Sequence, residues 1–203
     1  MRHASAIVVL ACGTTLSSAQ VAFDTYTPAG THSTNLFYAV PYTNSTNVEQ
    51  IGFRFISRDS GPVQRITLSA VRNNLTPAPV VQLYADDAGL PGARLGEWPI
   101  NLPVTPPGSL SFTSVDIANG PSLSGGSPYF LVVRQPIVSL AQRTDWYIGS
   151  VTNVGTLVWR GDESGSWEQD EKPYAAFRVI VPAPHSAAAL GIFFVAASLR
   201  RRR

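Results

Sequence analysis

The sequence predicts an all-β protein, an antiparallel β-sandwich of jelly-roll-like form with a signal peptide before it and a single hydrophobic helix after it. Three observations support this prediction. Short runs rich in β-branched and aromatic residues alternate with Gly, Pro, Asn and Asp between residues 20 and 181. No stretch of that region has the periodicity of an amphipathic helix. Short apolar segments lie near both ends of the chain, the first after a basic start and the second before a basic terminus.

The first 19 residues have the layout of a secretory signal peptide. A positively charged start precedes an apolar stretch at 6–11, and Ser17-Ser18-Ala19 then supplies small residues. This pattern predicts cleavage between Ala19 and Gln20. An alternative interpretation is a lipoprotein cut before Cys12. Because Cys12 is the only cysteine, cleavage after Ala19 leaves a chain that forms no disulfide.

The predicted strands are short runs bounded by turn residues. The run at 128–133 is continuously apolar, as expected of a central strand covered on both faces. In the run at 110–117, Leu110 and Phe112 are expected to point inward, and a break in the alternation near Val115 predicts a β-bulge. The polar stretch 25–47 is expected to be a first strand or loop packed onto the sandwich. The eight runs are 51–56, 63–71, 80–84, 110–117, 128–133, 146–148, 156–159 and 175–181.

Charge is distributed unevenly along the chain. The formal net charge is +2, but Arg2 and the arginines at 200–203 lie in the end segments. All 13 acidic residues lie between Asp24 and Glu171, against 10 basic residues in the central region, so the domain at 20–181 is acidic by about three charges. The excess of basic over acidic residues therefore arises from the two end segments of the chain. It does not indicate nucleic-acid binding.

The C-terminal segment predicts a membrane-associated tail. The stretch 183–199 is 17 residues long and apolar, and as a helix it would extend roughly 25 Å, the short end of what spans a bilayer. Arg200, Arg201, Arg202 and Arg203 follow it and are expected to stay on the cytoplasmic side. The alternative, an amphipathic surface helix, needs a polar face that this run lacks.

The order of these tail features resembles the PEP-CTERM sorting signal. Pro182, Ala183 and Pro184 stand in the place of the Pro-Glu-Pro motif, with alanine replacing the acidic residue, and the apolar helix and the arginine cluster follow. The resemblance implies three partners: a signal peptidase, an exosortase-like transpeptidase and the membrane. It also implies an exported protein of the cell envelope or extracellular space, anchored at least transiently in the cytoplasmic membrane.

The central region is similar to the choice-of-anchor extracellular domains, especially type R. The similarity rests on the strand–turn–strand pattern at 81–95, on the strand at 127–133, and on the later segments at 145–147, 165–167 and 176–179. It implies a compact surface module without enzymatic activity. The sequence thus divides into a signal peptide at 1–19, a β-sandwich extracellular domain at 20–181 and a sorting tail at 182–203.

Candidate metal and catalytic residues are few. Asp86-Asp87-Ala88-Gly89 is predicted to form a hairpin turn rather than a calcium loop, because calcium ligands usually alternate along the chain. Asp162 and Glu163 are the other acidic pair considered for calcium. His32 is the only histidine of the central domain and is expected to be a solvated loop residue without catalytic or zinc partners. We therefore predict no metal and no cofactor.

Two further possibilities concern carbohydrates. Paired carboxylates such as Glu97, Glu163 and Glu168 could serve a glycosidase, but nothing in the sequence brings two of them together. Trp98 and Trp167, each flanked by polar or small residues, are the candidates for an exposed glycan contact, whereas Trp146 and Trp159 lie in apolar strands and are expected in the core. The prediction is a non-enzymatic surface or matrix protein. The alternative is a carbohydrate-binding module whose partner is an extracellular polysaccharide.

Overall fold

The computed structural model describes residues 19–26, 32–33, 35–40, 49–72, 77–105, 111–136, 144–149, 153–161 and 163–183. Within these residues every element is a β-strand and every pairing between named strands is antiparallel, which confirms the predicted all-β class. The strands are β1 (Ala19–Asp24), β2 (Phe37–Val40), β3 (Glu49–Ile56), β4 (Gly61–Pro62), β5 (Arg65–Leu68), β6 (Ala70–Arg72), β7 (Val80–Asp87), β8 (Leu90–Pro99), β9 (Thr113–Asp116), β10 (Ser122–Leu123), β11 (Pro128–Gln135), β12 (Thr144–Tyr147), β13 (Val154–Arg160), β14 (Glu168–Pro173) and β15 (Phe177–Pro182).

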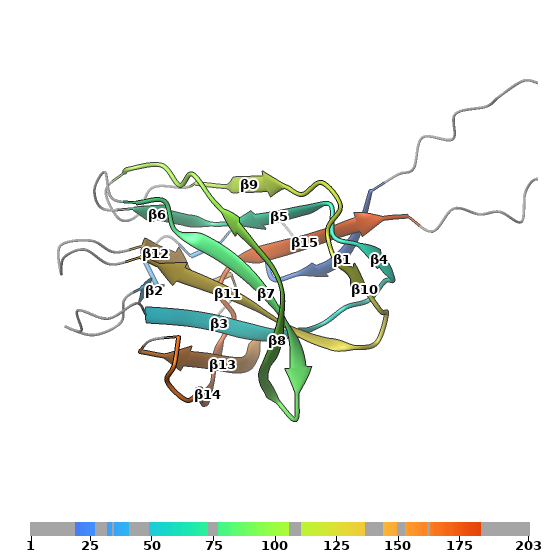
Figure 1. Ribbon diagram of the computed structural model, residues 1–203. Helices are drawn as coiled ribbons and strands as arrows, with labels where there is room; N and C mark the ends of the chain where they lie inside the picture. The colour runs from blue at the N-terminus through green and yellow to red at the C-terminus, as the bar shows by residue number, and fades with distance from the viewer. Residues whose placement is uncertain are drawn as a thin grey trace, which may run out of the picture. The chain divides into compact units, whose positions relative to one another are not determined.

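The strands form four sheets around one main core (Figure 1). The largest has the order β14-β13-β3-β11-β7-β8. Facing it are a four-stranded sheet, β1-β15-β5-β9, and a three-stranded sheet, β2-β12-β6, while β10 and β4 form a short pair. The core contains side chains from both sides, such as Phe53 and Leu131 of the large sheet and Ile66, Phe177 and Trp146 of the others. Burial of this shared apolar surface holds the sheets together.

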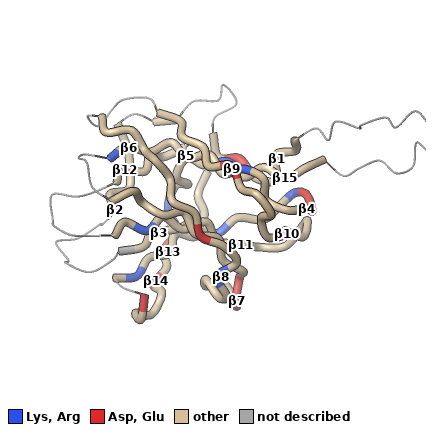
Figure 2. The backbone as a smooth tube through the Cα atoms, turned by 45° about the horizontal axis from the view of Figure 1, so that its top comes forward, with Lys and Arg blue, Asp and Glu red and all other residues tan. Residues whose placement is uncertain are grey.

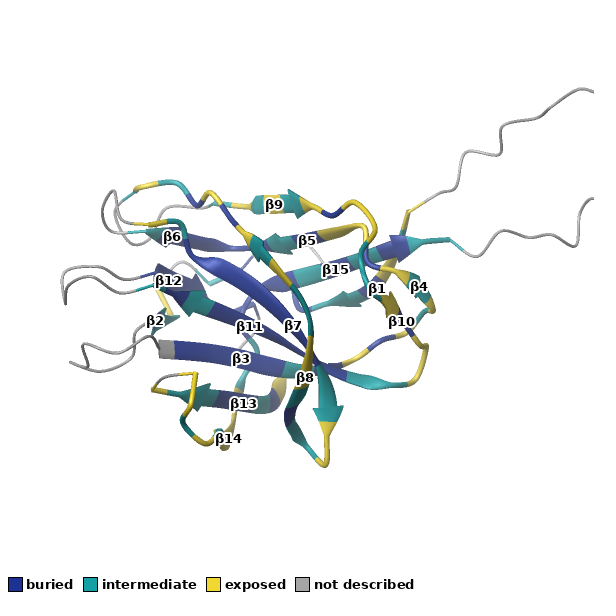
Figure 3. Cartoon of the chain, viewed as in Figure 1, coloured by how far each residue is buried: buried dark blue, intermediate teal, exposed yellow. Residues whose placement is uncertain are grey.

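The central strand of the large sheet is β11, as the continuous apolar run predicted. It pairs with β3 on one side and β7 on the other. Leu131 and Val133 point into the main core, and Phe130 and Val132 belong to a second apolar cluster on the opposite face. Figure 3 shows the burial along β11, β3 and β7, in contrast to the exposed edge strand β14. A strand buried on both faces needs no polar alternation.

Close packing in this strand pair makes Gly52 of β3 sensitive to substitution. A Cβ at Gly52 would lie 2.6 Å from Cγ2 of Val132 and 2.7 Å from the carbonyl oxygen of Leu131. We expect Gly52→Ala to lower the free energy of unfolding by about 1–3 kcal/mol through overpacking. Gly161→Ala is the matched control, because a Cβ there would meet no atom within 4 Å. Urea unfolding of both variants checks the prediction, and equal midpoints for the two would contradict it.

The predicted turn between β7 and β8 is present. Ala88 and Gly89 both have positive φ angles, of 52° and 91°, as a two-residue hairpin of type I′ requires. Oδ1 of Asp86 accepts a hydrogen bond from the backbone N–H of Gly89 at 3.1 Å. The short polar side chain thus satisfies a backbone donor in the turn.

Two details of the predicted run at 110–117 are wrong. The pairing of β9 with β5 is regular over its four residues, so there is no bulge near Val115. Phe112, expected to point inward, is 50% exposed and makes T-shaped ring contacts with Tyr26 and His32. The strand begins only at Thr113, so Phe112 lies outside the ladder that would have directed it inward. Leu110 lies outside the described residues.

The first and last strands meet at their outer ends. In β1 and β15, Ala19 is the Cα partner of Pro182, and Gln20 is the partner of Val181 (Figure 1). The folded unit extends from Ala19 to Pro184. The predicted apolar helix at 183–199 falls almost entirely outside the described residues, as do Cys12, the sorting-motif residue Pro184 and the cluster of Arg200, Arg201, Arg202 and Arg203. Within the described residues, no helix is long and apolar enough to cross a bilayer.

Candidate functional site

The outer face of the large sheet, which points away from the main core, has a small apolar cluster of its own. Phe130, Val132 and Val158 are fully buried there, beside Tyr84. Leu90 and Trp167 pack against these side chains. The loop after β13 therefore folds back over the sheet and brings Trp167 onto the cluster.

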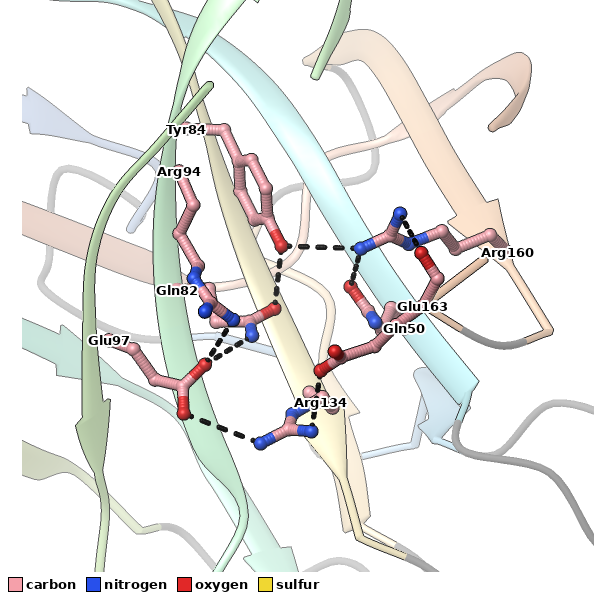
Figure 4. Close-up of polar contacts among 8 residues, drawn as sticks. All are labelled: Gln50, Gln82, Tyr84, Arg94, Glu97, Arg134, Arg160 and Glu163. Atoms are coloured by element: carbon pink, nitrogen blue, oxygen red, sulfur yellow. Dashed lines mark hydrogen bonds and ion pairs between the residues drawn. The ribbon is translucent and has the colours of Figure 1, made fainter. Parts of the chain in front are cut away.

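A network of charged and amide side chains borders this cluster (Figure 4). Its centre is Glu97, which accepts hydrogen bonds from Gln82 at 2.6 Å and Arg94 at 2.7 Å and pairs with Arg134 at 3.3 Å. Arg134 also pairs with Glu163 at 2.7 Å. The residues come from β7, β8, β11 and the loop after β13, so only the sheet register brings them together.

The second half of the network is organised by Arg160. Its Nη2 donates to Oε1 of Gln50 at 3.1 Å and lies 3.4 Å from the hydroxyl of Tyr84, which donates to Gln82 at 3.2 Å. Its guanidinium carbon lies 4.3 Å from the ring centroid of Trp167, a cation–π contact. One guanidinium therefore links the sheet to the loop that covers it.

Three buried N–H donors of this network have no hydrogen-bond partner within the described part of the chain: Nε2 of Gln50 and Nε of Arg134 and Arg160. Gln50 and Gln82 are fully buried. Buried donors of this kind are usually satisfied by ordered water or an ion. The network holds three guanidinium groups against two carboxylates. Figure 2 shows that positive and negative residues are interspersed over the described strands, so no single-sign stripe runs across them.

The structure brings together two of the three carboxylates considered for hydrolysis. Glu97 and Glu163 both pair with Arg134, at the border of the outer-face cluster. Each accepts a hydrogen bond from an arginine, whereas a glycosidase needs two carboxyl groups that face a scissile bond. Glu168 begins the edge strand β14 and is exposed. It forms no part of the network drawn in Figure 4.

Trp98 and Trp167 lie on opposite faces of the large sheet. Trp98 packs against the main core, with its ring over Gly96, where an added Cβ would lie 2.4 Å from the indole. Trp167 packs on the outer cluster and also contacts the ring of Tyr84 edge-on at 5.9 Å. The two are partly buried and do not form one aromatic platform. Of the two tryptophans expected in the core, Trp146 is fully buried and Trp159 is partly buried at the rim.

His32, expected to be solvated, is instead buried, with 7% exposure. Its ring stacks on Tyr147 at 5.1 Å, and Phe112 meets it edge-on. The hydroxyl of Ser69 lies 2.8 Å from Nε2 and donates its own proton to the carbonyl of Ser111 at 2.7 Å. Ser69 therefore acts as an acceptor for an imidazole N–H, which is not the arrangement of an activated nucleophile. The prediction of a solvated His32 is wrong because Ser69 and Tyr147, which contact its ring, are distant from it in the sequence.

Burial gives His32 a testable pH dependence. Desolvation lowers the pKa of His32 below its usual value near 6.5, so the unfolded chain binds the proton more readily. Stability is therefore retained above about pH 6.5 and is lost as the pH falls from there through the folded-state pKa. The loss is below about 1.4 kcal/mol per pH unit for one group. Thermal unfolding between pH 7.5 and 5 should show a shallower loss for His32→Gln, and identical slopes would contradict the assignment.

The acidic pairs considered for calcium have other partners. Asp86 forms an ion pair with Arg54 at 2.6 Å in addition to its turn hydrogen bond. Asp87 ends β7 at the exposed hairpin, and Asp162 lies outside the described residues. Glu163 pairs with Arg134. Across the described ranges, no three His, Cys, Asp or Glu side chains form a group that would hold a metal ion.

The inner face of the large sheet contains a hollow that the sequence did not reveal. Its volume is about 250 Å³, and it is lined by Tyr38, Ile51, Leu157, Trp159, Asp170 and Lys172. The apolar residues belong to β2, β3 and β13, and the charged pair belongs to the edge strand β14. The sequence predicted Trp159 for the core and gave no signal that Asp170 and Lys172 would lie beside it.

Comparison of the chain with protein-family models, with curated proteins and with solved structures gave no match.

Proposed function

We propose that this chain is an exported, non-enzymatic surface or matrix protein: a jelly-roll-like β-sandwich with a signal peptide before it and a PEP-CTERM-like sorting tail after it. The observation that carries the proposal is the pairing of Ala19 with Pro182 at the ends of β1 and β15. The predicted cleavage site and the predicted sorting motif thus sit at neighbouring positions at the boundary of the folded unit. The two predicted delivery segments would then begin at adjacent ends of β1 and β15.

The proposed partners of the chain follow from its predicted signal peptide and sorting tail. A signal peptidase would cut between Ala19 and Gln20, and an exosortase-like transpeptidase would act on Pro182-Ala183-Pro184. Because Gln20 and Pro182 lie within paired strands, we infer that the N-terminal cut precedes the closure of β1 onto β15. The apolar helix would hold the protein in the cytoplasmic membrane until the tail is processed. No metal or cofactor is assigned.

The choice-of-anchor resemblance agrees with this role. Both carboxylates of the outer-face network are paired with arginines, and Trp98 and Trp167 pack against apolar clusters, as in a compact module displayed on a tether. The alternative, a carbohydrate-binding module, cannot use Trp98 and Trp167 as one platform, because the main core and the outer cluster lie on opposite faces of the sheet. A carbohydrate-binding function would therefore require a different site.

Mass spectrometry of the protein isolated from its native cells tests the proposal. We expect an N-terminus at Gln20 and a C-terminus that has lost Arg200 to Arg203. Recovery of a chain that still begins at Met1 would contradict export through a cleaved signal peptide. Recovery of an intact arginine cluster would contradict processing of the tail.

A further inference from the structure

We propose that the hollow between β2 and the β13–β14 edge binds a single neutral pyranose ring, as a free sugar or as one unit of a polysaccharide. The inference goes beyond the display role and does not depend on export, since it concerns the folded domain alone. It also places the site away from the two tryptophans singled out in the sequence. Those two residues have packing roles, whereas the hollow combines apolar walls with a charged rim.

The walls of the hollow suit the apolar face of a sugar. Trp159 and Tyr38 border it and are both partly exposed, while Ile51 and Leu157 form its buried floor. The hydroxyl of Tyr38 donates to the carbonyl of Pro173 at 2.7 Å, and its ring packs on Phe53 at 5.3 Å. The Tyr38 side of the wall is therefore fixed before any ligand arrives, which reduces the cost of ordering on binding.

The rim supplies a hydrogen-bond acceptor and a hydrogen-bond donor that lie close together. Nζ of Lys172 lies 2.8 Å from Oδ2 of Asp170, and each side chain is about half exposed, at 47% and 48%. The carboxylate accepts hydrogen bonds and the ammonium donates them. Two adjacent hydroxyl groups, each of which both donates and accepts, match such a pair. The charges cancel, so the site has no preference for a charged sugar.

Asp170 and Tyr38 line the same hollow. Burial, and secondly the negative charge of Asp170, raise the pKa of Tyr38 to about 12. One pyranose ring in the hollow can therefore contact both the carboxylate and the aromatic wall. A hollow of about 250 Å³ corresponds to roughly eight water molecules, which suits one hexose rather than an enclosed oligosaccharide.

Lys172 provides a direct reporter, because it is the only lysine of the sequence. Reductive ¹³C-methylation keeps its charge and gives a single side-chain NMR signal, separate from that of the α-amino group. The full chain in a detergent without a sugar head group would be titrated with methyl glycosides of glucose, mannose, galactose and N-acetylglucosamine. We expect a saturable shift of the Lys172 signal for at least one of them, with a Kd on the order of 1 mM.

Variants assign the binding to this hollow. Asp170→Asn should weaken binding about tenfold or more, because it removes a charged hydrogen-bond acceptor from an exposed position. Trp159→Phe should weaken it less. The matched control is Asp116→Asn, which breaks the exposed Arg65–Asp116 pair on the opposite sheet and should leave the Kd unchanged. Unmodified protein followed by saturation-transfer NMR provides a readout that does not depend on the label.

Three results would overturn the proposal. One is the absence of a saturable shift with every pyranoside at concentrations far above 1 mM. Another is an equal loss of affinity in the Asp170 and Asp116 variants. The third is a shift of the Lys172 signal by cyclohexanol but by no sugar, which would mark the hollow as an apolar docking site for a partner protein. Failure of export in cells would leave this experiment unaffected, so the two proposals fail separately.

Discussion

Phe193→Asp is expected to release the protein from the membrane fraction while leaving its export intact. The six strong apolar residues of the predicted tail helix contribute only about −2 to −3.5 kcal/mol to insertion. An aspartate at the centre of a membrane helix costs about +2.5 to +3.5 kcal/mol. One substitution therefore cancels the whole driving force, without changing the length of the tail or its arginines.

Fractionation of cells followed by a carbonate wash measures this effect. Wild-type precursor and the Phe193→Leu control should remain with the membranes, because leucine inserts as favourably as phenylalanine. The Phe193→Asp protein should appear in the soluble exported fraction. If it stayed in washed membranes, the C-terminal segment would not be the anchor.

Trp146→Ala is expected to lower the free energy of unfolding by about 3–5 kcal/mol, the largest effect on stability in the domain. The indole is fully buried in the main core and contacts Phe53 and Phe177, each at a centroid distance of 5.8 Å. Its Nε1 donates to the carbonyl of Ala176 at 3.0 Å. Truncation leaves a cavity between the facing sheets and removes one of the two hydrogen bonds to the carbonyl of Ala176, the other coming from the backbone N–H of Ser69 at 3.0 Å.

Trp167→Ala provides the comparison for Trp146. Trp167 covers the smaller outer cluster and is partly exposed, so its loss should cost clearly less. Urea unfolding followed by far-UV circular dichroism gives both values, since fluorescence would itself change with the tryptophans. Equal costs for the two variants would mean that the main core does not dominate the stability of the fold.

The strands with a strong apolar signature could be predicted from the sequence. The run at 128–133 became the central strand β11, and Ile66, Leu68 and Ala70, which alternate with Thr67 and Ser69 in the predicted run 63–71, are all fully buried. The turn at Ala88 and Gly89 followed from the local preferences of the chain. In each case the information lies within a few neighbouring residues.

Other strands carry no such local signature. The edge strand β14, Glu168–Pro173, is almost entirely polar, and only its pairing with β13 makes it a strand. β1 begins at Ala19, where the sequence suggested a cleavage boundary rather than a strand. Its partner β15 lies more than 150 residues away, a separation that local patterns cannot bridge.

Whether the residues of a predicted site lie together depends on which face of a strand each side chain occupies. Trp98 and Trp167 look alike in sequence, yet the pleat and the loop after β13 send them to opposite faces. The Arg134 network and the burial of His32 likewise result from residues brought together by sheet register. Sequence patterns name such residues individually but do not place them relative to one another.

The central claim is that the β domain works outside the cytoplasm, delivered by the segments at its two ends. An enzyme reporter that is active only after export, fused after Val181 in place of the tail, tests it most directly. With residues 1–19 present, the reporter should be active outside the cytoplasm, and deletion of those residues should abolish its activity. Retention of the complete fusion in the cytosol would contradict the account.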